Sequence, residues 1–315
     1  MVSFNSMTIG TDVVAKFNDR VEGRTFLITG TSPAGIGAET AYCLGKAHPR
    51  LLILAGRSPS RIQPVLDKLR AEGVNAEVLL LDLSSQKSIR AFVETVRQEN
   101  IRIDVLINNA AIMACPYGLT EDGIETQFAT NFLGPFLLTN LLLQADLIVE
   151  RIVNVSSSAS VRSPHYLLAP LDDLTYSHGQ SYDPIQAYGV SKLALVLYTR
   201  ALAAKVASRG ITTFSLNPGS VISPLQQNVT EEMRQKAFKA ALKEDPNFTP
   251  PVRKTLQQGC ATQLRAGLDP HLRDQSGAYL DDCQVVELKQ HQGSFHARGK
   301  LWTIGEHLVG ESFDI

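Results

Sequence analysis

The sequence of 315 residues predicts a doubly wound α/β fold, in which helices cover both faces of a parallel sheet of about seven strands. Short β-branched or leucine-rich runs alternate with segments of helical period. The short runs are almost continuously apolar, as expected of strands that are buried on both faces. A glycine-rich loop, "TGTSPAGIG" at 29–37, stands directly behind the first run and ahead of a helical segment.

Six apolar runs are predicted to be strands, and two amphipathic helices are predicted between them. The helix at 58–73 repeats apolar residues on one face and ends at Gly73. The helix at 84–100 has the same kind of stripe behind a serine-rich start that can cap it. The predicted strands are 25–29, 50–56, 76–82, 103–108, 151–156 and 212–217.

The most apolar stretch of the chain, 132–149, is predicted to be a buried helix rather than a membrane span. Pro135, Asn140 and Asp146 interrupt it, and a free-standing bilayer span rarely tolerates such residues. In the sequence this helix runs straight into the strand predicted at 151–156. We therefore expect either a shortened helix or a strand that starts late.

Composition favours one soluble domain that binds a small molecule. A net charge of −1 gives no broad field to hold a nucleic acid or an anionic membrane. The four cysteines lie far apart without metal-ligand spacing, which favours a reduced, cytoplasmic protein without a metal site. Residues 1–315 are interpreted as a single domain with its core at 24–285. The segments 161–184 and 220–255 are interpreted as covers of a substrate site.

The loop at 29–37 is interpreted as a phosphate site. A strand, a loop with Gly30, Gly35 and Gly37, and a following helix can bring backbone N–H groups to a pyrophosphate. Thr40 stands where the last glycine of G-x-G-x-x-G belongs, so a turn without ligand stays open. Arg57, twenty positions after Gly37, favours the 2′-phosphate of NADP over the free hydroxyl of NAD. The alternative is that Arg57 pairs with a surface carboxylate.

A catalytic pair is predicted on a later helix. Tyr188 and Lys192 are four positions apart, so their side chains project from one face. A nearby ammonium stabilises a phenolate and is expected to lower the tyrosine pKa toward neutrality. Such a pair also occurs on ordinary helices. Upstream, "NVSSS" at 154–158 places hydroxyl groups at the end of a strand, where open α/β sheets bind ligands.

Taken in order, these motifs make residues 24–285 resemble the short-chain dehydrogenase/reductase family, which has a Rossmann-type sheet. The resemblance implies that Tyr188 is the general acid/base and that Lys192 holds the nicotinamide ribose and lowers the tyrosine pKa. It implies that Ser157 orients the substrate oxygen and that Asn131 completes a proton relay through a water. The matched motifs are 29–37, "LDL" at 81–83, "NNAA" at 108–111, "NFLG" at 131–134, "NVSSS" at 154–158, Y-x-x-x-K at 188–192 and "NPG" at 217–219.

The implied cofactor is NADP(H), and most of the matched motifs contribute to its site. Among the three serines, Ser157 is chosen because it aligns with the second serine of the family's strand-end pair, a choice that a shift of one position would overturn. The residues assigned to the cofactor are Gly30, Thr31, Ser32, Gly35, Ile36, Gly37, Arg57, Asp82, Leu83, Asn109, Ala110, Tyr188, Lys192, Pro218 and Gly219.

Three departures from the family pattern point to one branch of it. The glycine loop carries one extra residue, Ala111 replaces a glycine, and Ser157 and Tyr188 lie 31 positions apart (188 − 157). The long insertion resembles that of retinol dehydrogenases and the WW-domain oxidoreductase. Fungal members that act on natural-product intermediates are also similar and share the lengthened loop, which indicates a possible role in secondary metabolism.

The expected reaction interconverts a bulky, apolar alcohol and its ketone or aldehyde. A mostly apolar lid favours such a substrate over a sugar. A non-catalytic NADP(H)-binding sensor or scaffold of the same fold is the alternative, and an epimerase or dehydratase of nucleotide-linked sugars is a third reading. The resemblance also favours a homo-oligomer. The predicted lid residues are His165, Tyr166, Leu167, Leu168, Leu171, Val221, Ile222, Leu225 and Phe238, with Cys115 as a further candidate for the pocket wall.

Overall fold

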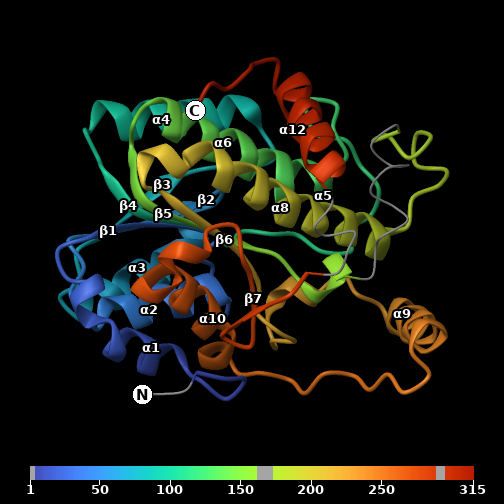
Figure 1. The fold of residues 1–315 in the computed structure, drawn as a ribbon, viewed down its shortest axis with the longest axis horizontal. Coiled ribbons are helices and arrows are strands. Elements are labelled where there is room, and N and C mark those ends of the chain that lie inside the picture. Colours follow the sequence, from blue (N-terminus) through green and yellow to red (C-terminus); the bar gives the residue numbers. More distant parts are fainter. Residues whose placement is uncertain (1–3, 162–172, 289–294) are drawn as a thin grey trace.

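The computed structural model describes residues 4–161, 173–288 and 295–315, in which an eight-stranded sheet lies between two layers of helices (Figure 1). The strand order is β3-β2-β1-β4-β5-β6-β7-β8, and β8 alone pairs antiparallel with its neighbour. The predicted α/β class is confirmed. The strands are β1 Thr25–Thr29, β2 Leu51–Gly56, β3 Ala76–Leu80, β4 Ile103–Asn108, β5 Ile148–Val155, β6 Thr212–Asn217, β7 Tyr279–Asp281 and β8 Gln284–Val286.

The structure has two apolar cores, one on each face of the sheet. Each core packs one layer of helices against the sheet. Figure 1 shows α4, α6, α8 and α12 over one face and α1, α2, α3 and α10 over the other. None of the helices in the described ranges is both long and apolar enough to cross a membrane. The first layer is α4 Gln86–Gln98, α6 Gly134–Gln144, α8 Pro184–Val206 and α12 Phe295–Val309, and the second is α1 Gly10–Lys16, α2 Ile36–Gly45, α3 Pro59–Ala71 and α10 Leu256–Leu268.

The connection between α6 and β5 differs from the prediction. The helix ends at Gln144 and the strand begins at Ile148, so the end of the predicted helix 132–149 belongs to the sheet. Asp146 adopts the left-handed conformation with φ +55°, and the N–H of Leu147 donates to the carbonyl of Leu142. This is the hydrogen-bond pattern that ends many helices within a few residues. The helix is therefore short, and the strand starts early rather than late.

A buried polar chain joins the centre of the sheet to α8. The Nδ2 of Asn108 on β4 donates to Oδ1 of Asn154 on β5 over 2.9 Å. The Nδ2 of Asn154 donates in turn to Oγ1 of Thr199 on α8, also over 2.9 Å. Oδ1 of Asn108 has no partner among the described residues, but the two buried bonds favour one arrangement of the elements that they join. The position of α8 over the strand ends is therefore fixed by hydrogen bonds as well as by apolar packing.

The last helix, α12, was not predicted from the sequence, and it packs on the outer side of α6 and α8. Trp302 is only 8% exposed, and its ring lies 5.3 Å from Phe136 and 5.8 Å from Tyr198, centre to centre. Gly305 faces Phe136 so closely that a Cβ would lie 2.8 Å from the ring. These aromatic contacts attach the C-terminal segment to the layer that holds the predicted catalytic pair.

The Trp302→Ala variant should lower the free energy of unfolding by about 3–5 kcal/mol, because removal of the ring leaves a cavity between α12 and α8. Urea denaturation followed by circular dichroism measures the change. Thr303→Ala is a matched control, since Thr303 is exposed on the same helix, and it should stay within about 0.5 kcal/mol of the wild type. If Trp302→Ala also changed the free energy of unfolding by no more than about 0.5 kcal/mol, the packing of Trp302 described above would be contradicted.

Candidate active site

A cavity of about 1270 Å³ runs along the carboxyl edge of the parallel strands. It exceeds the roughly 300–1,000 Å³ that a single small-molecule ligand usually occupies, so it has room for a cofactor and a substrate. Of the predicted site residues, only Gly37 and Asn131 do not line it. Those that do are Gly30, Thr31, Ser32, Gly35, Ile36, Arg57, Asp82, Leu83, Asn109, Ala110, Ser157, Tyr188, Lys192, Pro218 and Gly219.

The glycines of the first loop allow close backbone packing. Gly30 has φ +74°, and a Cβ on it would lie 2.6 Å from Cα of Ala110. A Cβ on Gly37 would lie 2.5 Å from both Nδ2 of Asn109 and the carbonyl oxygen of Gly30. Gly37 therefore lets α2 pack closely against the loop, and it does not line the cavity.

The extra residue of the loop lies in a tight turn. The N–H of Gly35 donates to the carbonyl of Ser32 over 3.2 Å, with Pro33 and Ala34 at the corner. Ala34 has φ +58°, an uncommon conformation for a residue other than glycine. No side chain caps α2 at Gly35, so the first N–H groups of this helix remain available to an anion.

Thr31 gives a second sign that the loop is built to contact a ligand. Its side chain is fully buried, and its hydroxyl has no hydrogen-bond partner within the described ranges. A buried polar group without a partner is uncommon in a native protein. Because Thr31 lines the cavity beside the uncapped start of α2, these residues fit the pyrophosphate of a dinucleotide.

Two arginines line the cavity beyond the loop, and the sequence predicted only one. Arg57 follows β2 and Arg61 lies in the first turn of α3, and both are exposed. No ion pair of either arginine is found among the described residues, so these residues give no support to the alternative role of Arg57 as a structural ion pair. The sequence carries a signal for Arg61, because it lies four positions after Arg57 in the helix that follows the same strand.

Hydrogen bonds fix the remaining walls of the cofactor region. The Nδ2 of Asn109 donates to the carbonyls of Thr29 (2.9 Å) and Gly30 (3.0 Å), so it fastens the loop after β4 to the glycine loop. Oδ1 of Asp82 accepts from the N–H and hydroxyl of Ser84 at 2.9 and 2.6 Å. Asn109 and Asp82 therefore shape the backbone of this region as well as facing the cavity.

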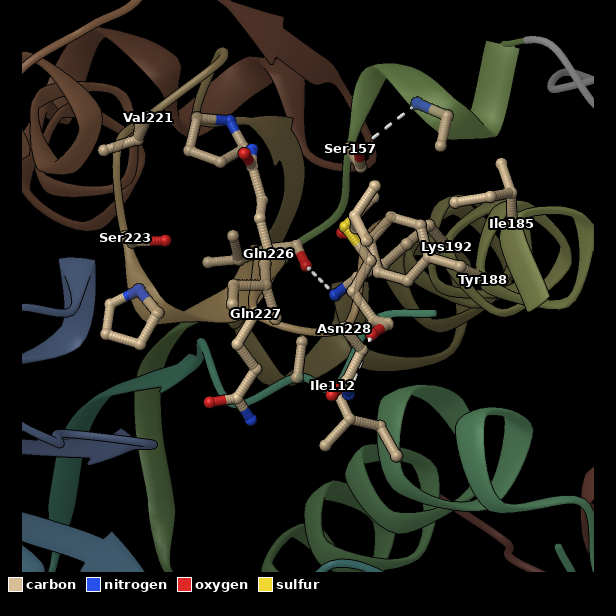
Figure 2. Close-up of a pocket in the computed structure, with 18 of the residues that line it drawn as sticks. Ile112, Ser157, Ile185, Tyr188, Lys192, Val221, Ser223, Gln226, Gln227 and Asn228 are labelled. Carbon is tan, nitrogen blue, oxygen red and sulfur yellow. Dashed lines mark hydrogen bonds between the residues drawn. The ribbon is translucent and has the colours of Figure 1, made fainter. Parts of the chain in front are cut away.

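The three serines after β5 have different surroundings. Ser156 is buried and its hydroxyl donates to the carbonyl of Lys192 over 2.7 Å. Ser158 is exposed, whereas Ser157 is half-buried and its side chain interacts with Tyr188, whose pKa it lowers. Figure 2 shows Ser157 on the same side of the cavity as Tyr188. The Ser157 hydroxyl also accepts from the N–H of Ala159 over 3.2 Å. The structure therefore brings Ser157, rather than Ser156 or Ser158, to the tyrosine.

Tyr188 and Lys192 are both buried on one face of α8. Nζ of Lys192 donates to the carbonyl of Val155 over 2.8 Å and lies 5.8 Å from the ring centre of Tyr188. Burial raises the pKa of Tyr188 to about 12, with the hydrogen bond from Ser157 opposing it, and burial lowers the pKa of Lys192 to about 7. The predicted lowering of the tyrosine pKa is thus not seen in the protein alone, because desolvation outweighs the stabilisation of the phenolate. Near neutral pH Tyr188 is a neutral phenol.

Asn131 is fully buried in a π-helical turn, Ala129–Leu133, ahead of α6. Its Nδ2 donates to the carbonyl of Ile112 (2.9 Å) and to the hydroxyl of Ser191 (3.0 Å). Its Oδ1 accepts from the N–H of Ile112 over 2.9 Å. With these bonds the amide holds the loop after β4 against α8. Asn131 does not line the cavity, and its relay role stays a prediction.

Gln127 makes a parallel connection that the sequence analysis missed. It is fully buried four positions before Asn131. Its Oε1 accepts from the N–H of Ala114 over 2.9 Å, and its Nε2 donates to the carbonyl of Pro184 over 2.9 Å. Gln127 and Asn131 therefore hold the same loop and the same helix at two points. The spacing of four is the sequence signal that they share a face.

The substrate side of the cavity combines apolar and polar residues. Val221, Leu225 and Phe238 line it, but Ile222 is 69% exposed and faces away from it. Cys115 is not among the lining residues. Carboxamides at 226–228 take part in the wall, together with residues of α9 (Glu231–Glu244). His165, Tyr166, Leu167, Leu168 and Leu171 lie outside the described residues.

The Lys192→Met variant should stabilise the cofactor-free protein more at pH ~6.5 than at pH ~9.5. The folded-state pKa of Lys192, about 7, lies below the usual 10.5, so the unfolded chain binds this proton more tightly. Burial of Lys192 therefore destabilises the fold most at and below pH 7, and the effect fades as the pH rises toward 10.5. Thermal melts of both proteins across this range measure the difference.

Lys46→Met is the control for this experiment, because Lys46 is exposed. Its effect on the melting temperature should be the same at both pH values. If the effect of Lys192→Met were equally independent of pH, the ammonium would not be desolvated in solution as the structure indicates.

Comparisons with known proteins agree with this geometry. Residues 24–168 match the family model described as short chain dehydrogenase. Retinol dehydrogenase 12 of Mus musculus is 35% identical over 94% of this chain and 90% of its own length. Short-chain dehydrogenase/reductase prx1 of Penicillium roqueforti is 34% identical over 95% of this chain and 89% of its own length.

Solved structures share the fold. An uncharacterised protein of Mycobacterium paratuberculosis superposes with a TM-score of 0.71 at 28% identity, over 95% of this chain and 98% of that one. A carbonyl reductase from chicken fatty liver, solved with NADPH, has a TM-score of 0.56 at 23% identity, over 85% of this chain and 100% of that one. With these similarities over nearly its whole length, and with Ser157, Tyr188 and Lys192 in one cavity beside the glycine loop, the chain belongs to the short-chain dehydrogenase/reductase family, in its retinol dehydrogenase-like branch.

Proposed function

We propose that this protein is an NADP(H)-dependent oxidoreductase that interconverts a bulky, largely apolar alcohol and its ketone or aldehyde. The observation that carries the proposal is the position of Ser157, Tyr188 and Lys192 in the same cavity as the glycine loop and Arg57. When bound, the nicotinamide supplies or accepts a hydride. The chain itself has to orient the substrate oxygen and move one proton.

In the reducing direction, the Ser157 hydroxyl donates a hydrogen bond to the substrate oxygen and the Tyr188 phenol gives its proton to the same atom. The raised pKa of Tyr188 keeps the phenol protonated before the reaction, which suits proton donation. Lys192 lies one helical turn away and stabilises the phenolate that remains. Asn131 is assigned a positioning role, because its amide holds Ile112 and Ser191 in place.

A preference for NADP(H) is supported by Arg57 and Arg61. Both guanidinium groups are exposed, line the cavity and have no carboxylate partner in the described chain. A guanidinium binds a phosphate by charge-assisted hydrogen bonds, whereas it has no such advantage with a free ribose hydroxyl. The chicken carbonyl reductase that shares the fold was solved with NADPH.

A non-catalytic NADP(H) sensor is the alternative function. It would need the cofactor cavity but not the Ser157–Tyr188 contact, nor a buried lysine whose desolvation destabilises the fold. An enzyme acting on nucleotide-linked sugars is less well supported, since Ile112, Ile185 and Val221 make the wall near Tyr188 apolar. A single domain over 1–315, a homo-oligomer, a cytoplasmic location and a role in secondary metabolism stay predictions.

Replacing Tyr188 with Phe should lower kcat/KM at least ~10²-fold, because the proton donor is lost. A panel of apolar ketones and aldehydes with NADPH, followed by absorbance, measures the rates. NADPH binding, followed by fluorescence, should be unchanged. Tyr198→Phe is the matched control, since Tyr198 is buried on the same helix and its hydroxyl donates to Oδ1 of Asn140. NADPH binding without turnover of any compound would support the sensor instead.

Replacing Arg57 with Asp should raise the Kd for NADPH at least ~10-fold and change the Kd for NADH far less, because a bond to a charged partner contributes about 1.5–3 kcal/mol. Arg61→Asp should act in the same direction. Arg102→Asp is the control, because Arg102 is an exposed arginine next to the start of β4, at the opposite edge of the sheet. Equal losses for both cofactors would remove the role assigned to the two arginines.

A further inference from the structure

The wall that faces Tyr188 across the cavity combines apolar and amide side chains. Ile112 and Val221 give it apolar surface, and Ile185 lies beside Tyr188 on α8. Gln226 and Asn228 lie between the turn at Val221 and the Tyr188–Lys192 pair (Figure 2). Gln226 is half-buried and Asn228 is exposed. An apolar substrate that packed over them would remove water from both amides without giving them partners.

Gln226 is oriented by an arginine. Nη1 of Arg253 donates to Oε1 of Gln226 over 2.8 Å, which uses the acceptor side of this amide. Its Nε2 group has no hydrogen-bond partner within the described ranges. Since the two ends of a carboxamide cannot exchange once the oxygen is held, Gln226 presents an N–H donor to its surroundings.

Asn228 presents the opposite polarity. Its Nδ2 donates to the carbonyl of Met113 over 3.5 Å, a contact that joins the segment before α9 to the loop after β4. Its Oδ1 has no partner in the described chain and is an acceptor. A donor on Gln226 and an acceptor on Asn228 thus stand two residues apart in one wall of the cavity.

We propose that the substrate carries a second oxygen function, a hydroxyl in the favoured case, which binds Gln226 and Asn228 while its reacting carbonyl meets Ser157 and Tyr188. A hydroxyl accepts one hydrogen bond and donates another, so it satisfies both amides. The apolar body between the two oxygens packs on Ile112 and its neighbours. This inference rests on the proposed function and narrows its substrate class to oxygenated, largely apolar ketones or aldehydes.

Matched pairs of bicyclic ketones test the inference. Unsubstituted decalone and a set of hydroxydecalones, which carry the hydroxyl at different carbons, are reduced with NADPH. We expect at least one hydroxydecalone to have a kcat/KM about 10-fold above that of decalone, as one or two net hydrogen bonds predict. In Gln226→Leu and Asn228→Leu this preference should fall toward ~1, while the rate with plain decalone is retained or rises.

Two controls separate a substrate contact from other effects. Asn247→Leu replaces an exposed amide of the same covering segment that does not line the cavity, and it should leave the preference within about twofold. The Kd for NADPH and the melting temperature are measured for every variant. The inference is supported if Gln226→Leu and Asn228→Leu lose the preference for the hydroxydecalone while their Kd for NADPH and their melting temperature stay unchanged.

Three outcomes would overturn it: no preference for any hydroxydecalone, a preference that survives in both leucine variants, or a rise in the Kd for NADPH that parallels the loss of rate. The last result would indicate that Gln226 and Asn228 contact the cofactor rather than the substrate. Turnover of plain decalone that depends on Tyr188 would leave the proposed function standing in each case. Absence of any ketone reduction would instead defeat the proposed function, and the inference with it.

Discussion

The attachment of α8 to the end of β5 is the interaction on which the site depends. Nζ of Lys192 donates to the carbonyl of Val155, and the hydroxyl of Ser156 donates back to the carbonyl of Lys192. These reciprocal bonds set the distance between the helix that carries Tyr188 and the strand end that carries Ser157. Because the bonds are buried, a shift of either element would leave a polar group without a partner in a low-dielectric environment. Tyr188 and the hydroxyl of Ser157 are therefore held in one geometry before any ligand binds.

The loop after β4 is held to this pair by two buried amides rather than by apolar packing alone. Asn131 and Gln127 lie on one face of a short helical segment and reach the same loop and the same helix. The loop carries Ala110 and Ile112, which line the cavity. The cofactor floor and the catalytic helix are thus connected through side chains that do not face the cavity. Such residues position the site, and their effect passes through the groups that they hold.

Features set by local sequence could be predicted, whereas those set by tertiary packing could not. Tyr188 and Lys192 follow from helical spacing, and the glycine loop follows from the backbone approach that a Cβ would block. Burial of the pair could not be inferred from spacing, so the sign of the tyrosine pKa shift was wrong. The early start of β5 depends on the left-handed conformation of Asp146, which an apolar run does not indicate.

The same distinction applies to the site residues. Gly37 is assigned to the cofactor from the motif, and only the structure shows that it also lets α2 pack against Asn109 and Gly30. Arg61 was missed because it belongs to the next helix rather than to the strand end, although the fold brings both to one cavity. The strands β7 and β8 escaped prediction since each has only three residues, too few for a periodic pattern.

The two halves of the cavity differ in how they are built, and this difference bears on specificity. The cofactor half and the catalytic groups lie on strand ends and on α8, which the buried polar chain through Asn154 joins to the sheet. The substrate half also uses the segment from Val221 to α9, which lies outside both helix layers in Figure 1. Substitutions in that segment disturb few buried contacts, so the amides at 226 and 228 can change while Ser157 and Tyr188 keep their positions. The residues that contact the substrate can in this way vary while the residues proposed for the chemistry are kept.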